Sequence, residues 1–509
     1  MTTNTKVASS IAGASVILTL MGFLSKGIGF FREIIYANNF GLSPEYDLFL
    51  ASIAIPNVIN TSIIYIAQHY FVPSYNRIKK VSETDSVDFF NYIFWWFIIG
   101  GLILATLLYI SSGLILSSYL GSISSEKQQL GIKIFVMFLI TIPLNAGMSI
   151  IMAFQQAKFK FAYPAISLIL LNVIVIILVV LFSDLLEILI LPISFVIAYF
   201  TAFIFLIVLV KKDLTFFSKS FFKVKYNVFE LRVIITLIII EISSLSYILI
   251  DRYFINEVSV GGIAALNYAM VIFSLPISLF SIPLITTMFS KFSNSPDTLK
   301  SDFKSGYGMI LFIIIPFMFL FYFWGDLFIY LFYERGKFTP SDTDLTYSVL
   351  RYFSLGLIFI SVYQLTVKIF YSLNKYFLVL AISISAILIK CILNLWLVKI
   401  MQENGLAIST TIAYLFLLVL GISIISVKFD IIDIKHFLLK LLYFLVNALM
   451  AYLLTRILLS FNNKNDIYLA SSMLISFVFI YMLNSLITKN HELELITSSI
   501  KNLFNIKKV

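Results

Sequence analysis

Residues 162–183 read AYPAISLILLNVIVIILVVLFS, an apolar stretch without a charged side chain. A helix needs about 20 apolar residues to cross the hydrocarbon core of a bilayer. A short break containing Asp184 follows, and a second apolar stretch then runs from residue 188 to 210. The sequence therefore predicts two consecutive membrane-spanning helices joined by a short polar turn.

The same pattern fills most of the chain. Hydrophobic residues make up 60% of the sequence and charged residues 12%, against roughly 45–50% and about 25% in soluble proteins. We predict an all-α polytopic membrane protein whose first span is retained and is not a cleaved signal peptide. The predicted fourteen spans are residues 9–31, 46–72, 87–110, 131–154, 162–183, 188–210, 231–250, 262–288, 307–325, 345–370, 376–398, 405–427, 436–458 and 467–488.

The distribution of basic residues predicts the orientation. Lys and Arg are concentrated in cytoplasmic loops of membrane proteins, and alternate loops of this chain are basic. The opposite loops are poor in basic residues and carry Glu45, Asp184, Glu257 and Asp326. Both termini are therefore expected in the cytoplasm. The net charge of +10 then reflects topology and contact with anionic lipid, and it requires no nucleic-acid partner.

An internal repeat predicts two lobes. A shift of 220 residues places Arg32 on Arg252, Gly41 on Gly261 and Pro56 on Pro276. Parallel repeats of this kind are typical of transporters. We predict an N-terminal lobe of six spans over residues 1–210, a C-terminal lobe of six spans over 231–430, and two extra spans with a cytoplasmic tail over 431–509. Residues 211–230, with Phe216 and Phe217 among lysines, suit an amphipathic cytoplasmic linker.

Charged residues interrupt the first span. Lys26, Arg32 and Glu33 are interleaved with Gly27 and Gly29. Both cations could snorkel to the interface. Alternatively, they line a water-filled cavity and bind an anionic substrate, because Arg binds phosphate through two parallel hydrogen bonds and Lys adds a compact charge. The glycines would allow bending and close backbone approach.

Other polar residues occur inside later spans. Pro56 predicts a bend in the second span, where Asn57 and Asn60 supply amides, and Pro276 is its repeat counterpart. Glu241, Lys390 and Asn394 lie mid-span, where a charge is costly unless it faces the protein interior. Glu241 and Lys390 are expected either to form a static ion pair or to take part in ion coupling or gating.

Several function classes are excluded or disfavoured by the sequence. No Walker-type phosphate-binding loop is present, and the three histidines and single cysteine form no metal-binding pattern. No nucleophile–base pair stands out, so we expect no enzyme activity, no metal and no cofactor. Transport would then be coupled to the membrane potential or to a monovalent cation.

Several stretches of the chain resemble the lipid II flippase family (MurJ, also called MviN) of the multidrug/oligosaccharidyl-lipid/polysaccharide exporter superfamily. The resemblance is carried by Gly29-Phe30-Phe31-Arg32-Glu33, Phe40-Gly41, Asp47-Leu48-Phe49, Ile55-Pro56-Asn57, Phe71-Val72-Pro73, the loop Leu331-Phe332-Tyr333-Glu334-Arg335-Gly336-Lys337-Phe338, Tyr352-Phe353-Ser354-Leu355-Gly356-Leu357 and Phe370-Tyr371-Ser372.

The resemblance implies a flippase that moves undecaprenyl-pyrophosphate-linked sugars to the outer leaflet of the bacterial inner membrane by alternating access. It implies that Arg32 is needed for function and that Lys26 takes the place of an arginine. It also implies a sodium site that draws on acidic and amide groups, here Glu241 and Asn394, with Lys390 as a competing built-in cation. Asn60 replaces a family arginine, and Met270-Val271 replace an Asp-Arg pair, so the cavity is less cationic than usual.

We therefore predict a lipid II flippase with Lys26, Arg32, Glu33, Asn57 and Asn60 at the substrate site and Gly27, Gly29, Pro56 and Pro276 as hinges. The alternatives are a flippase for O-antigen, capsule or another surface glycan, a multidrug antiporter, and a scaffold for cell-wall assembly. Expected partners are the lipid-linked glycan, the bilayer and cell-envelope biosynthesis proteins.

Overall fold

The computed structural model describes residues 22–121, 124–215, 231–294, 298–458, 467–488, 490 and 492–494. Within these ranges the regular secondary structure is helical and contains no strand. The chain divides into two compact units, Met1–Ala264 with Tyr333–Thr339, and Ala265–Phe332 with Pro340–Val509. From residue 216 onward, the predicted amphipathic linker over 211–230 lies outside the described residues.

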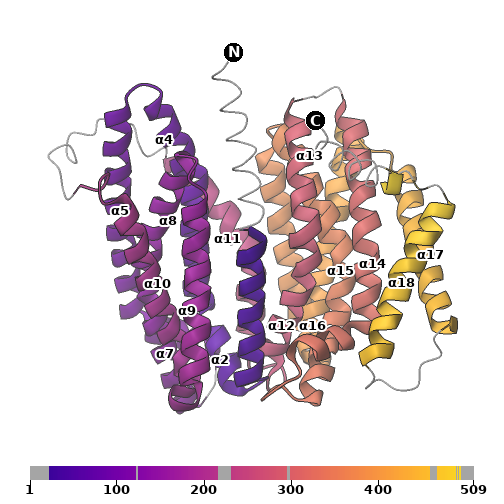
Figure 1. The fold of residues 1–509 in the computed structure, drawn as a ribbon, viewed down its shortest axis with the longest axis horizontal. Helices are drawn as coiled ribbons and strands as arrows, with labels where there is room; N and C mark the ends of the chain where they lie inside the picture. Colours follow the sequence, from indigo (N-terminus) through magenta and orange to yellow (C-terminus); the bar gives the residue numbers. More distant parts are fainter. Residues whose placement is uncertain are drawn as a thin grey trace. The chain divides into compact units, whose positions relative to one another are not determined.

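Figure 1 shows the helices of both units, coloured along the sequence. The first unit starts with a helix over residues 22–40. It continues with α2 (Pro44–Ser52), α3 (Ala54–Ile66), the π-helix η1 (Ala67–Phe71), α4 (Val72–Lys79), α5 (Glu83–Ile110), α6 (Ser112–Leu120), α7 (Ser125–Leu139), α8 (Thr141–Ala157), α9 (Ala162–Leu186), the 3-10 helix η2 (Glu187–Leu189), α10 (Ile190–Val210) and α11 (Leu231–Tyr253).

Helix α12 (Gly262–Pro276) begins at the end of the first unit and continues into the second. The second unit then contains the π-helix η4 (Ile277–Ser281), α13 (Ile282–Asn294), α14 (Leu299–Tyr333), α15 (Pro340–Ser372), α16 (Tyr376–Phe429), α17 (Ile434–Leu458) and α18 (Ile467–Ile487).

The described helices confirm a polytopic all-α membrane fold. Eight helical segments are long and apolar enough to cross a membrane, or nine if the bent pair Pro44–Ser52 and Ala54–Lys79 is one span. Two of the eight, Ala162–Val210 and Tyr376–Phe429, contain 49 and 54 residues. Straight helices of that length would be about 70–80 Å long, more than twice the hydrocarbon core. Each instead folds back on itself, and the predicted total of fourteen spans stays a prediction.

The two long segments are hairpins with the same turn. Glu187 has φ 48° and ψ −134°, and Gln402 has φ 50° and ψ −129°. Figure 1 shows α9 and α10 side by side in the first unit. In α16, Lys390 donates a hydrogen bond to Thr410, although 20 residues of straight helix would separate them by about 30 Å.

The turns that precede the hairpins also match. Phe159 has φ 59° and Asn374 has φ 57°. Asn374 follows Phe159 by 215 residues, and Gln402 follows Glu187 by the same number. The internal repeat predicted from the sequence is therefore visible in the backbone, at a shift of 215 in this part of the chain. The shift of 220 holds for the earlier turn glycines Gly41 and Gly261, which have φ 52° and 82°.

Prolines lie at two further helix distortions. Pro56 has no N–H to donate to the carbonyl of Ser52, and the helix bends by 43° between Ser52 and Ala54. Pro276 ends α12, and the π-helix η4 follows directly. The bend predicted near Pro56 is present, whereas motion at Pro56 or Pro276 stays a prediction.

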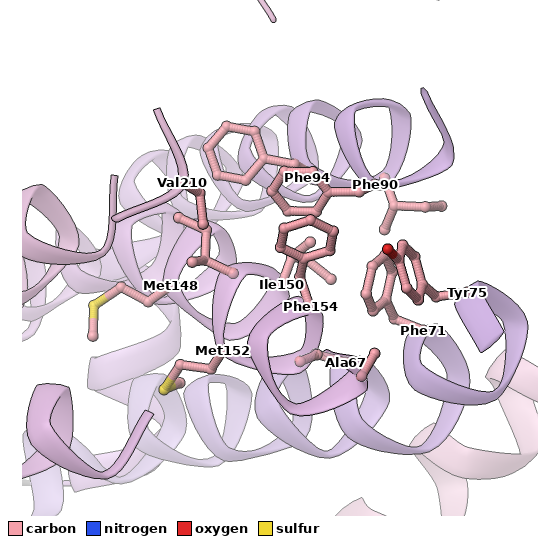
Figure 2. Close-up of a cluster of buried hydrophobic side chains, with 14 of the residues drawn as sticks. Ala67, Phe71, Tyr75, Phe90, Phe94, Met148, Ile150, Met152, Phe154 and Val210 are labelled. Atoms are coloured by element: carbon pink, nitrogen blue, oxygen red, sulfur yellow. The ribbon is translucent and has the colours of Figure 1, made fainter. Parts of the chain in front are cut away.

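An aromatic cluster holds the π-helix η1 of the first unit in place. Figure 2 shows Phe71 and Tyr75 packed near Phe154 and Phe90, all almost completely buried. The rings of Phe90 and Phe154 stack with centroids 3.9 Å apart. Stacked aromatic pairs add roughly 0.5–1.5 kcal/mol beyond their buried area. The cluster therefore fixes η1 and the neighbouring polar residues against α5 and α8.

The hairpin of α16 depends on close backbone contact, which gives the first prediction. A Cβ at Gly405 would overlap the carbonyl group of Leu397 on the facing arm. Gly405→Ala should therefore cost about 1–3 kcal/mol, the usual cost of overpacking, and lower the thermal unfolding midpoint of the purified protein by several degrees. Gly100→Ala on α5 is the matched control, because among the described residues no atom lies within 4 Å of its Cβ position. An equal midpoint for both variants would contradict the close approach.

Candidate functional site

Arg32 joins the first described helix to the hairpin of α9 and α10. Its Nη1 donates to Oδ1 of Asn172 on α9 at 2.9 Å, and its Nη2 donates to Oε1 of Glu33 at 2.7 Å. The guanidinium carbon lies 5.4 Å from the ring centre of Tyr36 and 5.5 Å from that of Phe195 on α10. We call Arg32, Glu33 and Asn172 the arginine site.

The arginine site retains donor capacity and access. The side chain of Arg32 is 22% exposed and that of Glu33 is 10% exposed. The Nε–H of Arg32 is buried and has no hydrogen-bond partner among the described residues. A guanidinium has more N–H donors than these two bonds use. The guanidinium therefore has N–H groups left over for a further anionic or polar ligand.

Local structure orients the arginine site. The Nδ2 of Asn172 donates to the carbonyl of Leu168, one turn earlier on α9, at 2.9 Å. This bond leaves the amide oxygen to face Arg32. Sequence reasoning missed Asn172, although it is the only Asn or Gln in the apolar stretch 162–183. A single amide in an otherwise apolar span is a sequence feature that could have identified Asn172.

Lys26 is exposed on the same helix, about 9 Å of helix rise before Arg32. Gly27 is exposed and Gly29 is partly buried. Among the described residues, no atom lies within 4 Å of the Cβ position at either glycine. The close backbone approach expected there is therefore not seen in the described part of the chain, and the predicted bending remains a prediction.

The two amides of the second span have different surroundings. Asn57 is exposed. Asn60 is only 2% exposed. Its Nδ2 donates to the hydroxyl of Thr141 at 2.8 Å, and its backbone carbonyl accepts from Nδ2 of Asn145 at 2.9 Å. These bonds tie α3 to α8. Since its amide is enclosed there, Asn60 cannot reach a ligand in this conformation.

Glu241 lies on α11, which packs against α3 in the first unit. It is partly buried and lies within electrostatic range of Tyr65 on α3. The ring of His69, in the π-turn η1, stacks on Tyr65 with centroids 4.0 Å apart. π-turns are frequent at functional sites, and sequence reasoning did not connect Tyr65 and His69 with Glu241.

Lys390 and Asn394 lie between the two arms of α16 in the second unit, both 0% exposed. The Nζ of Lys390 donates to Oγ1 of Thr410, and the hydroxyl of Ser409 donates to Oδ1 of Asn394. Glu241 belongs to the other unit, so its pairing with Lys390 stays a prediction.

A buried carboxylate holds the start of α12. Oδ2 of Asp47 accepts the N–H of Gly261 at 2.7 Å, and Oδ1 accepts the N–H of Ala264 at 2.6 Å. Asp47 is 5% exposed. A negative charge at a helix N-terminus is favourable because the first amides have no partners within the helix. We call this arrangement the Asp47 latch; its loops lie on the predicted outer side.

A second contact supports the same region of the first unit. The N–H of Lys337 donates to the carbonyl of Asn38 at 2.8 Å, and Gly336, with φ 59°, packs directly against Asn38. The ring of Tyr333 lies 6.2 Å from that of Phe30. The loop Tyr333–Thr339, which carries part of the family resemblance, therefore packs on the helix that bears the arginine site.

Among the described residues, no group of three or more His, Cys, Asp or Glu side chains is placed to hold a metal ion.

Comparisons with known proteins place these sites in context. The family model described as "Lipid II flippase MurJ" matches residues 36–487. A probable lipid II flippase MurJ of Buchnera aphidicola subsp. Schizaphis graminum is 28% identical over 418 residues, which cover 77% of this chain and 79% of the relative. One from Borreliella burgdorferi is 25% identical over 447 residues, covering 84% and 86%. The lipid II flippase MurJ of Thermosipho africanus is 26% identical over 439 residues, covering 85% and 87%.

Two solved structures illustrate the similarity in fold. The structure titled "Lipid II flippase MurJ, inward closed conformation" aligns with a TM-score of 0.80 at 22% identity and covers 93% of this chain and 99% of that chain. An inward-facing multidrug resistance MATE transporter of the MOP superfamily aligns with a TM-score of 0.64 at 12% identity, covering 80% and 96%. At these identities the likeness concerns the fold, and it confirms the predicted all-α polytopic fold class.

Proposed function

This chain belongs to the lipid II flippase MurJ family, and from that premise we propose that it carries lipid II from the inner to the outer leaflet of the bacterial cytoplasmic membrane. Lipid II is an undecaprenyl-pyrophosphate-linked saccharide, so the protein must move a charged headgroup through a region where charge is costly. We further propose alternating access as the mechanism, with both termini in the cytoplasm and without enzyme activity.

The arginine site is the observation that carries the substrate contact. Arg32 is held in place by Asn172 and Glu33, yet its Nε–H has no partner among the described residues and a fifth of its side chain is exposed. A pyrophosphate oxygen would satisfy that donor once the site opens in the transport cycle, and Arg binds phosphate through two parallel hydrogen bonds. Lys26, exposed on the same helix, would add a second positive charge.

Glu33 would tune the arginine site. Its Oε1 accepts a hydrogen bond from Nη2 of Arg32 at 2.7 Å. The carboxylate therefore offsets part of the positive charge of Arg32 before the substrate arrives. A fully unpaired arginine would bind the pyrophosphate too tightly to release it on the other side. We propose that the pyrophosphate competes with Glu33 for Arg32, and that the pair re-forms when the headgroup leaves.

The described bend before Pro56 and the π-turn after Pro276 are proposed as hinges, together with Gly27 and Gly29. The exposed Asn57 is proposed as a sugar contact. A membrane potential supplies about 2.3 kcal/mol per elementary charge per 100 mV. That energy is enough to bias cationic residues between inward and outward positions.

The surface-glycan alternative retains one supporting feature, the less cationic Asn60 and Met270-Val271 positions, but Asn60 is enclosed between α3 and α8. The relatives reported above are all named as lipid II flippases. The lipid II assignment is therefore favoured, and the likeness to multidrug transporters concerns the fold.

Genetic rescue tests the proposed substrate. Expression of this chain should restore growth of a bacterium depleted of its own lipid II flippase, and it should not restore surface glycan in a strain that lacks its O-antigen flippase. The opposite pattern would overturn the lipid II assignment in favour of the surface-glycan alternative.

A further inference from the structure

The polar cluster inside α16 is the feature that the proposed function does not use. Lys390, Asn394, Ser409 and Thr410 are all 0% exposed and face one another across the hairpin. The hydroxyl of Thr410 donates to the carbonyl of Leu406 at 2.9 Å while it accepts from Lys390. We call these four residues and the Leu406 carbonyl the hairpin cluster.

The hairpin cluster is not required by the fold. At the repeat shift of 215, Val175 and Val179 of α9 correspond to Lys390 and Asn394, and both valines are 0% exposed. The remaining geometry is preserved, because Ser194 donates to Leu191 at 2.8 Å as Ser409 donates to Leu406 at 2.9 Å. The first unit thus builds the same hairpin with an apolar interior.

The chemistry of the cluster is that of a cation site. It presents a threonine hydroxyl, an asparagine amide oxygen and a backbone carbonyl, all oxygen ligands of the kind that bind hard cations such as Na⁺, and transporters place such sites in broken helices. The described residues do not fit a free sodium ion, however, because the ammonium of Lys390 already takes the Thr410 oxygen. A second cation at hydrogen-bonding distance from that ammonium would be repelled.

We propose that Lys390 is a tethered cation that replaces a bound monovalent ion in the hairpin cluster, so that this chain needs no sodium there. The claim that Lys390 replaces a bound ion does not depend on the proposed function. Its consequence, lipid II transport that does not depend on sodium, rests on the proposed function and leaves the membrane potential as the driving force.

Thermal unfolding of the purified full-length protein tests the cation site directly. In sodium chloride and in choline chloride of equal ionic strength, the parent protein should unfold at the same midpoint. Lys390→Asn removes the ammonium but keeps polar oxygens in the cluster, so this variant should be less stable in choline and should gain a saturable stabilisation by sodium. Lys368→Asn is the control, because Lys368 lies over the rings of Phe289 and Tyr371 outside the cluster, and it should gain no sodium response.

A sodium-specific stabilisation of the parent would overturn the proposal, and so would a Lys390→Asn protein that gains no sodium response. If that variant does not accumulate, Lys390→Gln replaces it under the same criteria, since it keeps chain length and a hydrogen bond to Thr410. In a lipid II flipping assay, the parent rate should be equal in sodium and choline. The rate of Lys390→Asn should fall at least about tenfold in choline, the size of one charge-assisted hydrogen bond, and recover in sodium. A parent that does not flip lipid II would count against the proposed function and leave the thermal result standing.

Discussion

Arg32→Ala is expected to reduce lipid II translocation by about 100-fold or more while the protein still inserts and folds. Arg32 makes two hydrogen bonds to Asn172 and Glu33 and retains a buried donor for a ligand. Two charge-assisted bonds to a pyrophosphate are worth about 3 kcal/mol or more, and each 1.4 kcal/mol is about tenfold. The measurement is the rate of lipid II flipping in proteoliposomes, normalised to the amount of folded protein.

Three further variants separate binding from folding. Arg32→Lys keeps the charge but loses the two-pronged geometry, so an intermediate loss is expected. Asn172→Ala removes one support of the guanidinium and should have a smaller effect than Arg32→Ala. Arg351→Ala is the matched control, because Arg351 is an exposed arginine that lies over Tyr322 in the second unit. An Arg32→Ala protein that flips lipid II at the parent rate would remove Arg32 from the substrate site.

Asp47→Ala is expected to open the Asp47 latch. The carboxylate accepts two short backbone hydrogen bonds, from Gly261 and Ala264, and bonds to charged groups are worth about 1.5–3 kcal/mol each. Their loss should shift the equilibrium away from the latched state by at least about 100-fold. Because alternating access requires both states, transport should fall by about tenfold or more.

Chemical labelling reports the latch directly. Leu42 contacts Gly261 and is 8% exposed, so a Leu42→Cys probe in a Cys391→Ser background should react slowly with a membrane-impermeant maleimide added outside. Asp47→Ala should speed that reaction at least about tenfold, in line with the loss of one such bond. Glu45→Ala is the control, because Glu45 is an exposed acidic residue two positions before Asp47 on the same helix. Equal labelling rates in all three backgrounds would show that Asp47 does not hold the closed state.

Much of the fold was predictable because its determinants are local. Apolar length predicts spans, and Gly41, Gly261 and Pro56 predict the turns and the bend that the structure contains. The arginine site was half predictable: Arg32 and Glu33 stand out as charges in an apolar helix, whereas their partner Asn172 comes from a helix 140 residues away. Sequence spacing cannot give a contact between distant helices.

Asn60 and Lys390 show that the sequence also does not reveal which way a polar side chain inside a span points. Both attract notice as polar groups inside spans, but whether such a group faces a cavity or a neighbouring helix depends on packing. Asn60 bonds Thr141 across a helix pair, and Lys390 bonds Thr410 within its own hairpin. The polar break between the predicted spans 376–398 and 405–427 indicated the turn at Gln402. It did not indicate which side chains of the two arms meet across that turn.

The most direct test is translocation of defined lipid-linked sugars by the purified protein in proteoliposomes, with and without an imposed voltage. The parent protein should move lipid II between leaflets, faster with the voltage applied, and Arg32→Ala should not move it. Retention of lipid II in its original leaflet while an O-antigen-type lipid crosses, or equal rates for the parent and Arg32→Ala, would contradict the account.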